Sequence, residues 1–137
     1  MRRIALDTNA YVAFKRGDEG AIEIIRHADR IAMSSVVLGE LLAGFACGNR
    51  VARNRRELSA FLDSPRVQLL GIGPTTADYY ARIFAALRSR GQPVPTNDLW
   101  VAASALEEGC ALFTYDRHFD VIENLPTGRT LDDFLPL

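Results

Sequence analysis

The chain has 137 residues, a formal net charge of −1 and 48% hydrophobic residues, which are ordinary values for one globular domain. This composition argues against a disordered chain, which needs low hydrophobicity and a high net charge. We expect neither a membrane span nor a signal peptide, because no apolar run approaches about 18 residues and the first one ends at Asp7.

Short apolar runs alternate along the chain with segments that have helical spacing and capping residues, a pattern typical of strands separated by helices. The predicted strands cover residues 3–6, 31–33, 67–72 and 110–113, with a weak fifth strand near 129–131. The predicted helices comprise one capped by Thr8 or Asn9, then 21–28, 36–46, 50–62, 75–90, and one from 96 or 97 to 108.

Two helices carry apolar residues that we expect to face inward. They are Val51, Leu58, Phe61 and Leu62 in the segment 50–62, and Tyr79, Ile83, Ala86 and Leu87 in the segment 75–90. Continuous apolar strands separated by helices indicate a parallel sheet covered on both faces. The sequence therefore predicts one domain over residues 1–137, a three-layer α/β/α sandwich with a short, mainly parallel sheet of four to five strands.

Two acidic residues follow predicted strands. Asp7 comes directly after the first strand, and Asp116 comes shortly after the fourth. In an open parallel sheet the carboxyl ends of the strands border one crevice, where such folds bind ligands. We therefore expect these two carboxylates to converge.

Two further acids are candidates for the same crevice. Glu40 is the only charged residue between Arg30 and Arg50, and an ionised Glu in this apolar segment either points to solvent or is held by a cation. Asp98 lies in the first turn of a helix, where the helix dipole alone favours an acid. Its spacing from small residues on the same face would nevertheless bring it close to the sheet.

Four carboxylates held close together repel one another unless cations neutralise them. A site made of carboxylate oxygens suits Mg²⁺ or Mn²⁺, whereas zinc would favour His and Cys. Such ions activate water and stabilise charge on a phosphate. The pattern therefore predicts phosphoryl or phosphodiester chemistry on an anionic substrate.

Basic residues give weaker indications. Fifteen of the 16 basic residues are Arg, and Arg53 and Arg56 share a helix face that is either a solvated surface or a contact for RNA phosphates. Arg117 and His118 follow Asp116 at the edge of the expected crevice, where they either contact substrate or pack within a loop. The two cysteines, Cys47 and Cys110, are too few for a disulfide framework, so we expect a reducing, cytoplasmic location.

Four segments together resemble the PIN domain, and within it the VapC-type ribonuclease toxins of prokaryotic toxin–antitoxin pairs. In chain order they are Ile4-Ala5-Leu6-Asp7-Thr8-Asn9, Ser34-Ser35-Val36-Val37-Leu38-Gly39-Glu40-Leu41, Gly91 to Ala103 around Asn97-Asp98, and Thr114-Tyr115-Asp116-Arg117-His118-Phe119. Each segment alone is weak evidence for the resemblance, but the order and spacing of the four segments together are specific to this family.

The resemblance implies a Mg²⁺-dependent endoribonuclease, with Mn²⁺ able to substitute. Asp7, Glu40, Asp98 and Asp116 match the catalytic and metal-binding acids of the family, with Asp7 and Asp98 as the principal ligands. Asn9 and Thr114 match residues that orient these carboxylates. The resemblance also implies a homodimer inhibited by a small antitoxin. Val37 departs from the family, which often has a hydroxyl residue there.

Two other functions remain open from the sequence. A PIN-like module could bind RNA or a partner without catalysis, although four intact acids weigh against it. A Mg²⁺-dependent phosphate-handling domain of related shape usually needs an acid beside its nucleophilic Asp and a late lysine, whereas Asp7 is followed by Thr8 and the only lysine is Lys15. The sequence has no phosphate-binding loop of P-loop type.

Overall fold

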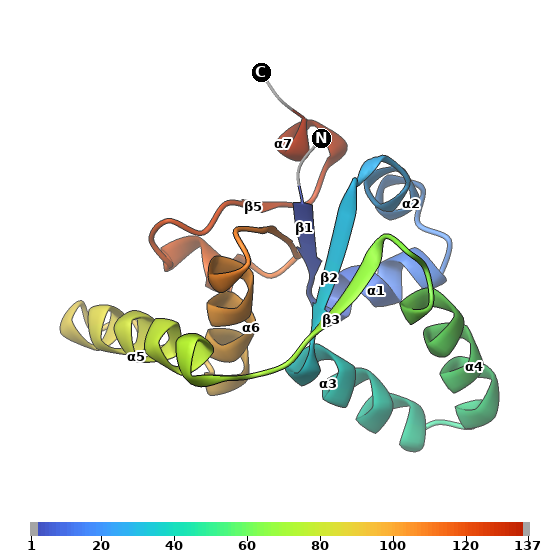
Figure 1. Cartoon of the computed structure of the whole chain (residues 1–137), viewed down its shortest axis with the longest axis horizontal. Coiled ribbons are helices and arrows are strands. Elements are labelled where there is room, and N and C mark those ends of the chain that lie inside the picture. Colours follow the sequence, from blue (N-terminus) through green and yellow to red (C-terminus); the bar gives the residue numbers. More distant parts are fainter. Residues whose placement is uncertain (1–2, 136–137) are drawn as a thin grey trace.

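Five parallel strands form the central sheet of the computed structural model, which describes residues 3–135 (Figure 1). Their spatial order is β3-β2-β1-β4-β5. The bounds of the strands are β1 Arg3–Leu6, β2 Arg30–Ser34, β3 Val67–Leu70, β4 Ala111–Phe113 and β5 Thr127–Gly128. Strands β1, β2 and β4 are almost entirely buried, as expected for parallel strands covered on both faces.

Helices cover both faces of this sheet. Figure 1 shows α5 and α6 on one side and α1, α2 and α4 on the other. The helices are α1 Thr8–Lys15, α2 Glu19–His27, α3 Ser35–Ala46, α4 Val51–Leu62, α5 Pro74–Ser89, α6 Thr96–Glu107, the short 3₁₀ helix η1 Arg117–Val121 and α7 Leu131–Phe134. The predicted three-layer α/β fold is confirmed.

The close packing of α6 follows from its sequence. Ala102, Ala103 and Ala105 are fully buried, and their small side chains let the helix lie against β2 and β4. Gly109 ends this segment with a φ of 66°, a left-handed conformation that glycine adopts without strain. None of the helices within residues 3–135 combines the length and hydropathy needed to cross a membrane.

The fifth strand lies two residues earlier than the sequence predicts. It covers Thr127–Gly128, and Leu131 begins α7 instead of continuing a strand. The backbone N–H groups of Arg129 and Thr130 donate to the Asp133 carboxylate at 2.9 and 3.0 Å, so they cap α7 and are not used by the sheet. A Cβ at Gly128 would lie 2.6 Å from Cζ of Phe134, so only glycine permits this close packing of α7 on β5.

Two residues expected to face inward are exposed instead. Val51 is 37% exposed at the first position of α4, about two helical turns before the buried Leu58. Ala86 is exposed because it borders an open groove beside α5, whereas Ile83 and Leu87 on the same helix are buried. The remaining inward-facing predictions for these helices are buried or partly buried.

Candidate functional site at the carboxyl edge of the sheet

The sheet reverses its strand order between β1 and β4. From β1 the chain proceeds to β2 and β3 on one side, and it later returns to β4 and β5 on the other. A crevice forms outside the carboxyl ends of the strands at such a switch point. Asp7 follows β1 and donates its backbone N–H to the Phe113 carbonyl of β4 at 3.0 Å, so it lies directly at this point.

Asp7 is buried and held on both carboxylate oxygens. It is the N-cap of α1, with Oδ1 accepting the Thr8 N–H at 2.9 Å and Oδ2 accepting the Thr114 hydroxyl at 2.7 Å. Burial raises the pKa of Asp7, and the negative charges of Asp98 and Glu40 raise it further, while the two hydrogen bonds oppose this shift. The ionised form is therefore costly, although its position is fixed.

Glu40 points toward the same crevice from α3. Its Oε1 accepts the Thr8 hydroxyl at 2.7 Å, across 32 positions of sequence. Its charge acts on both Asp7 and Asp98, which excludes a free solvent-facing position. Thr8, which the sequence suggested only as a helix cap, thus connects two of the acids through its backbone N–H and its hydroxyl.

Asp98, Asp116 and His118 form the closest group at the site. One ligand atom of each lies within 4.8 Å of the others, and these three residues are the only such group of His, Cys, Asp or Glu found within residues 3–135. Burial raises the pKa of Asp98, the charges of Asp116 and Glu40 raise it further, and the neighbouring His118 lowers it. Asp7, Glu40 and Asp98 thus interact electrostatically, and Asp116 joins them through its interaction with Asp98.

None of the four acids forms an ion pair with a permanent cation, Lys or Arg, of residues 3–135, and the only basic group of this part of the chain in contact with them is His118. The raised pKa values of Asp7 and Asp98 show that the ionised carboxylates lack stabilisation, which a divalent cation would provide. The donor atoms of the four acids are oxygens, which hard divalent cations prefer. The residues present therefore fit such an ion.

Thr114 and Asn9 make different contacts. The Thr114 hydroxyl donates to Asp7 and accepts the Asp116 N–H at 3.0 Å, so it connects two acids. The Asn9 Oδ1 accepts the Tyr115 N–H at 3.2 Å. Asn9 thus holds the backbone of the loop that carries Asp116, instead of contacting a carboxylate directly.

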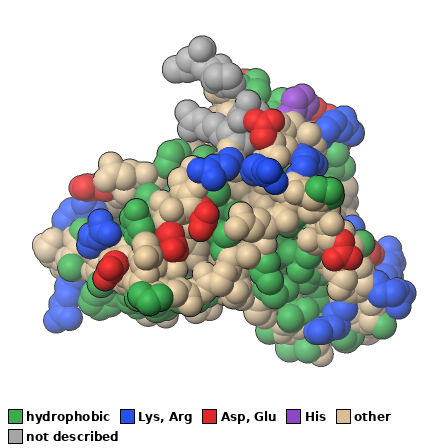
Figure 2. Space-filling model, viewed as in Figure 1, with side chains coloured by type: hydrophobic (Ala, Val, Ile, Leu, Met, Phe, Trp, Pro, Cys, Tyr) green, Lys and Arg blue, Asp and Glu red, His purple; other side chains and the backbone are tan. Residues whose placement is uncertain are grey.

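The candidate RNA contacts are distributed unevenly. Arg117 is exposed and lines a hollow of about 140 Å³ together with Thr114 and Asp116. Arg53 is paired with Glu57 at 3.0 Å on α4, and Arg56 is exposed on the same helix. On the face seen in Figure 2, basic side chains lie on separate parts of the surface instead of forming one continuous stripe.

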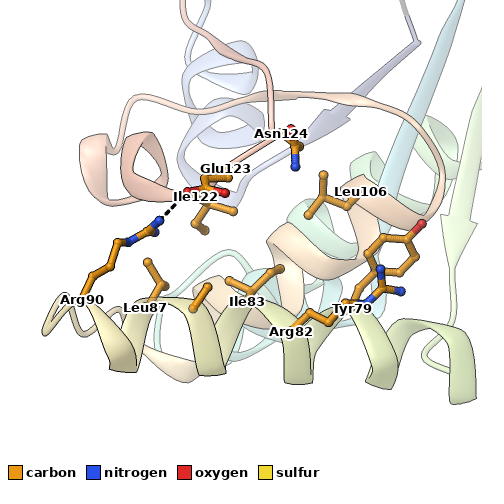
Figure 3. Close-up of a pocket in the computed structure, with 10 residues that line it drawn as sticks. Tyr79, Arg82, Ile83, Leu87, Arg90, Leu106, Ile122, Glu123 and Asn124 are labelled. Carbon is orange, nitrogen blue, oxygen red and sulfur yellow. Dashed lines mark hydrogen bonds and ion pairs between the residues drawn. The ribbon is translucent and has the colours of Figure 1, made fainter.

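A second groove, of about 270 Å³, lies between α5 and the segment after η1 (Figure 3). Its floor contains Ile83, Leu87 and Leu106, and its one carboxylate, Glu123, is paired with Arg90 at 2.7 Å. None of the four acids lines it. The carboxyl edge of the sheet is therefore the better candidate for chemistry.

Comparison with known proteins agrees with this geometry. Residues 4–125 match the PIN domain family. The chain is 31% identical to Ribonuclease VapC4 of Mycobacterium tuberculosis, over 87% of this chain and 90% of the relative. It is 30% identical to Ribonuclease VapC2 of Rickettsia felis, over 88% of this chain and 92% of the relative.

Solved structures give the same relationship. The fold matches VapBC2 of Rickettsia felis bound to a fragment of promoter DNA, with a TM-score of 0.80 and 27% identity over 92% of this chain and 97% of that one. It also matches DNA-bound VapBC of Salmonella typhimurium, with a TM-score of 0.81 and 27% identity over 93% and 98% of the two chains. The chain belongs to the PIN domain family, in its VapC ribonuclease group.

Proposed function

We propose that this chain is the toxin of a toxin–antitoxin pair, an endoribonuclease that hydrolyses RNA phosphodiester bonds at the carboxyl edge of its sheet. The observation that carries this proposal is the meeting of Asp7, Glu40, Asp98 and Asp116 at the β1/β4 switch point, without a Lys or Arg of the described residues to neutralise them. Membership of the VapC ribonuclease group supports RNA as the substrate.

The proposed cofactor is Mg²⁺, with Mn²⁺ able to substitute. When bound, such an ion supplies an activated water and stabilises negative charge on the phosphate. Asp7 and Asp98 are proposed as its principal ligands, while Glu40 and Asp116 bind it through water or position the attacking water. The raised carboxyl pKa values support this assignment, because a bound cation would offset both the burial and the repulsion that raise them.

Neighbouring hydrogen bonds keep these side chains ready for binding. Thr114 holds one oxygen of Asp7, and Thr8 holds one oxygen of Glu40, so neither carboxylate has to give up much freedom when the substrate arrives. A carboxylate oxygen that accepts one hydrogen bond still has lone pairs for another partner. We therefore propose Thr8 as a positioning residue beside Thr114, with Asn9 acting on the loop that carries Asp116.

Arg117 is the proposed RNA contact nearest to the acids, because its exposed side chain borders the hollow that includes Thr114 and Asp116. Arg53 and Arg56 are proposed as a second set of phosphate contacts on α4, farther from the chemistry. Their contribution is sequence-independent affinity that falls with salt. His118 contacts Asp98 and Asp116 while its side chain stays 59% exposed, so it is proposed as a further RNA contact at the edge of the acidic crevice.

The proposed protein partner is a small antitoxin that covers the acidic crevice, as the relationship to VapBC complexes supports. We also propose a homodimer and a cytoplasmic location. The location is supported by the RNA substrate and by the two free cysteines, Cys47 and Cys110.

RNA cleavage by the purified protein tests the function. RNA is incubated with Mg²⁺ and the new ends are sequenced, using the wild type, Asp98→Asn and the matched control Asp78→Asn, whose acid is exposed on α5. We expect defined cleavage sites for the wild type and Asp78→Asn, and none for Asp98→Asn. Full cleavage by Asp98→Asn would reject its proposed role, and RNA binding without cleavage by the wild type would identify a binding module instead.

A further inference from the structure

The imidazole of His118 lies between two of the site carboxylates. Its Nδ1 is 3.1 Å from Oδ1 of Asp116 and 3.5 Å from Oδ2 of Asp98. His118 therefore adds a nitrogen atom to a site that was predicted from the sequence to consist of carboxylate oxygens. The question is whether His118 serves as a counter-ion for the acids or as a ligand beside them.

The distances favour a ligand. A ring N–H at Nδ1 could donate to Asp116, since 3.1 Å is an ordinary hydrogen-bond length, but the 3.5 Å to Asp98 exceeds the usual range of about 2.7–3.2 Å, so one hydrogen bond does not account for both contacts. Two donors bound to the same ion by bonds of about 2.1 Å lie roughly 3.0–3.4 Å apart at octahedral or tetrahedral angles. The separations of 3.1 and 3.5 Å from Nδ1 to the carboxylates are close to that range.

The local fold sets this position. Asp116 is the N-cap of η1, and its Oδ1 accepts the His118 N–H at 2.9 Å, which returns the chain over the carboxylate. Phe119, the next residue, is fully buried and anchors the turn. The imidazole itself is 59% exposed, so water can hydrogen-bond its other ring nitrogen, as is usual for a histidine that binds metal.

We infer that His118 Nδ1 is a direct ligand of the divalent ion and that Asp116 binds the ion directly beside Asp98, instead of through the water proposed above, which makes Asp98, Asp116 and His118 a mixed nitrogen and oxygen site. This inference rests on the proposed function only in taking the acidic crevice as an ion site. An imidazole ligand favours first-row transition ions over Mg²⁺. The site therefore binds Mn²⁺ more tightly than Mg²⁺, and His118 accounts for much of that preference.

Binding of Mn²⁺ to the purified chain tests the inference without any measurement of cleavage. Calorimetry gives the affinities for Mn²⁺ and Mg²⁺, and electron spin echo envelope modulation of bound Mn²⁺ detects a coordinated ¹⁴N nucleus. The variants are His118→Asn, which keeps a polar side chain but loses the imidazole, and His27→Asn. His27 is a matched control because it is the only other histidine, lies exposed at the end of α2 and faces Glu23.

We expect the ¹⁴N signal in the wild type and in His27→Asn, and its loss in His118→Asn. Affinity for Mn²⁺ falls by at least about tenfold in His118→Asn, and affinity for Mg²⁺ falls less. Bound Mn²⁺ without a ¹⁴N signal in the wild type overturns the inference and leaves the proposed ribonuclease intact. A ¹⁴N signal that depends on His118, in a protein that cleaves no RNA, would support His118 as a ligand and reject the proposed ribonuclease activity.

If Mn²⁺ does not bind the wild type at all, both the ligand assignment and the ion site are rejected. The variant His118→Ala repeats the test without an amide that could itself offer an oxygen. Because His118 is exposed and its anchoring neighbour Phe119 is unchanged, both variants should fold, which far-UV circular dichroism checks.

Discussion

At the amino edge of the sheet, arginine side chains donate to backbone carbonyls, whereas at the carboxyl edge carboxylates face one another. Arg66 donates to the carbonyls of Ile25 and Ala28 at the end of α2, and Arg30 donates to the Pro65 carbonyl. At the opposite edge, burial and mutual repulsion raise the pKa of Asp7 and Asp98. Charge at the first edge stabilises the fold, while charge at the second is retained at a cost to stability.

The largest difference between the two edges is expected when one acid at each edge is neutralised. Asp7→Asn should lower RNA cleavage by at least about 100-fold without loss of stability. Asn is also a good N-cap for α1, and the costly buried charge is gone. Glu108→Gln, near Arg3 and Arg30 at the amino edge, should leave cleavage unchanged. Cleavage kinetics and urea unfolding of both variants give the comparison, and a strongly destabilised Asp7→Asn would contradict it.

Divalent ions should stabilise only the carboxyl edge. An ion that binds the folded chain alone adds about 2.7 kcal/mol of stability at a concentration 100 times its dissociation constant. We expect Mn²⁺ to raise the thermal midpoint of the wild type and of Asp78→Asn, and to raise that of Asp98→Asn much less. Thermal melts with Mn²⁺ and with EDTA measure this, and equal shifts in all three proteins would place the ion elsewhere.

Loss of a cation at the amino edge should affect stability alone. Arg66→Ala removes hydrogen bonds from a charged group to two carbonyls, so the free energy of unfolding should fall by about 2 kcal/mol. The matched control is Arg88→Ala, an exposed residue of α5, for which we expect a change within about 0.5 kcal/mol. A cleavage defect in Arg66→Ala at a temperature where it is fully folded would show that the two edges are coupled.

The smallest effect is expected away from both edges, at Tyr11. Its hydroxyl is buried without a partner among the described residues, so Tyr11→Phe should keep or raise stability by up to about 1 kcal/mol at neutral pH. Burial, with a contribution from the charge of Glu57, raises the pKa of Tyr11 from 10.0 to about 12.

The raised pKa of Tyr11 makes its contribution to the free energy of unfolding depend on pH. The pKa is higher in the folded chain, so the stability that Tyr11 contributes is full below pH 10 and is lost as the pH rises through about 12. Tyr11→Phe should lack this part of the alkaline loss. Urea unfolding at neutral pH and above pH 10 measures it, and identical alkaline curves for both proteins would argue that Tyr11 has a normal pKa.

The overall fold and the family could be predicted because their signals are local. The apolar strands, the helix caps and the acids that follow strands are all visible in short stretches of sequence, and parallel strands then place Asp7 and Asp116 at one edge. The two-residue strand β5 gave no such signal. Its position depends on the contact between Gly128 and Phe134 and on capping by Asp133, which no periodicity reveals.

The finer details of the site depend on contacts between distant elements. The hydrogen bond from Thr8 to Glu40 requires α1 and α3 to pack side by side, and the sequence suggested only a capping role for Thr8. For His118 the sequence predicted either substrate contact or loop packing, and the contact with Asp98 follows from the tight turn of η1, which the sequence does not reveal. Asn9, the second residue of α1, accepts the backbone N–H of Tyr115 and so holds the loop that carries Asp116.

Asp7 starts α1 and also belongs to the acidic crevice, and this double use limits how a descendant of the chain could lose its activity. Replacement by Ala would remove an N-cap and cost about 1 kcal/mol of helix stability, whereas Asn, Ser or Thr would silence the site while the helix stays capped. An inactive relative that survives as a pure binding protein should therefore carry one of these three polar residues where this chain has Asp7.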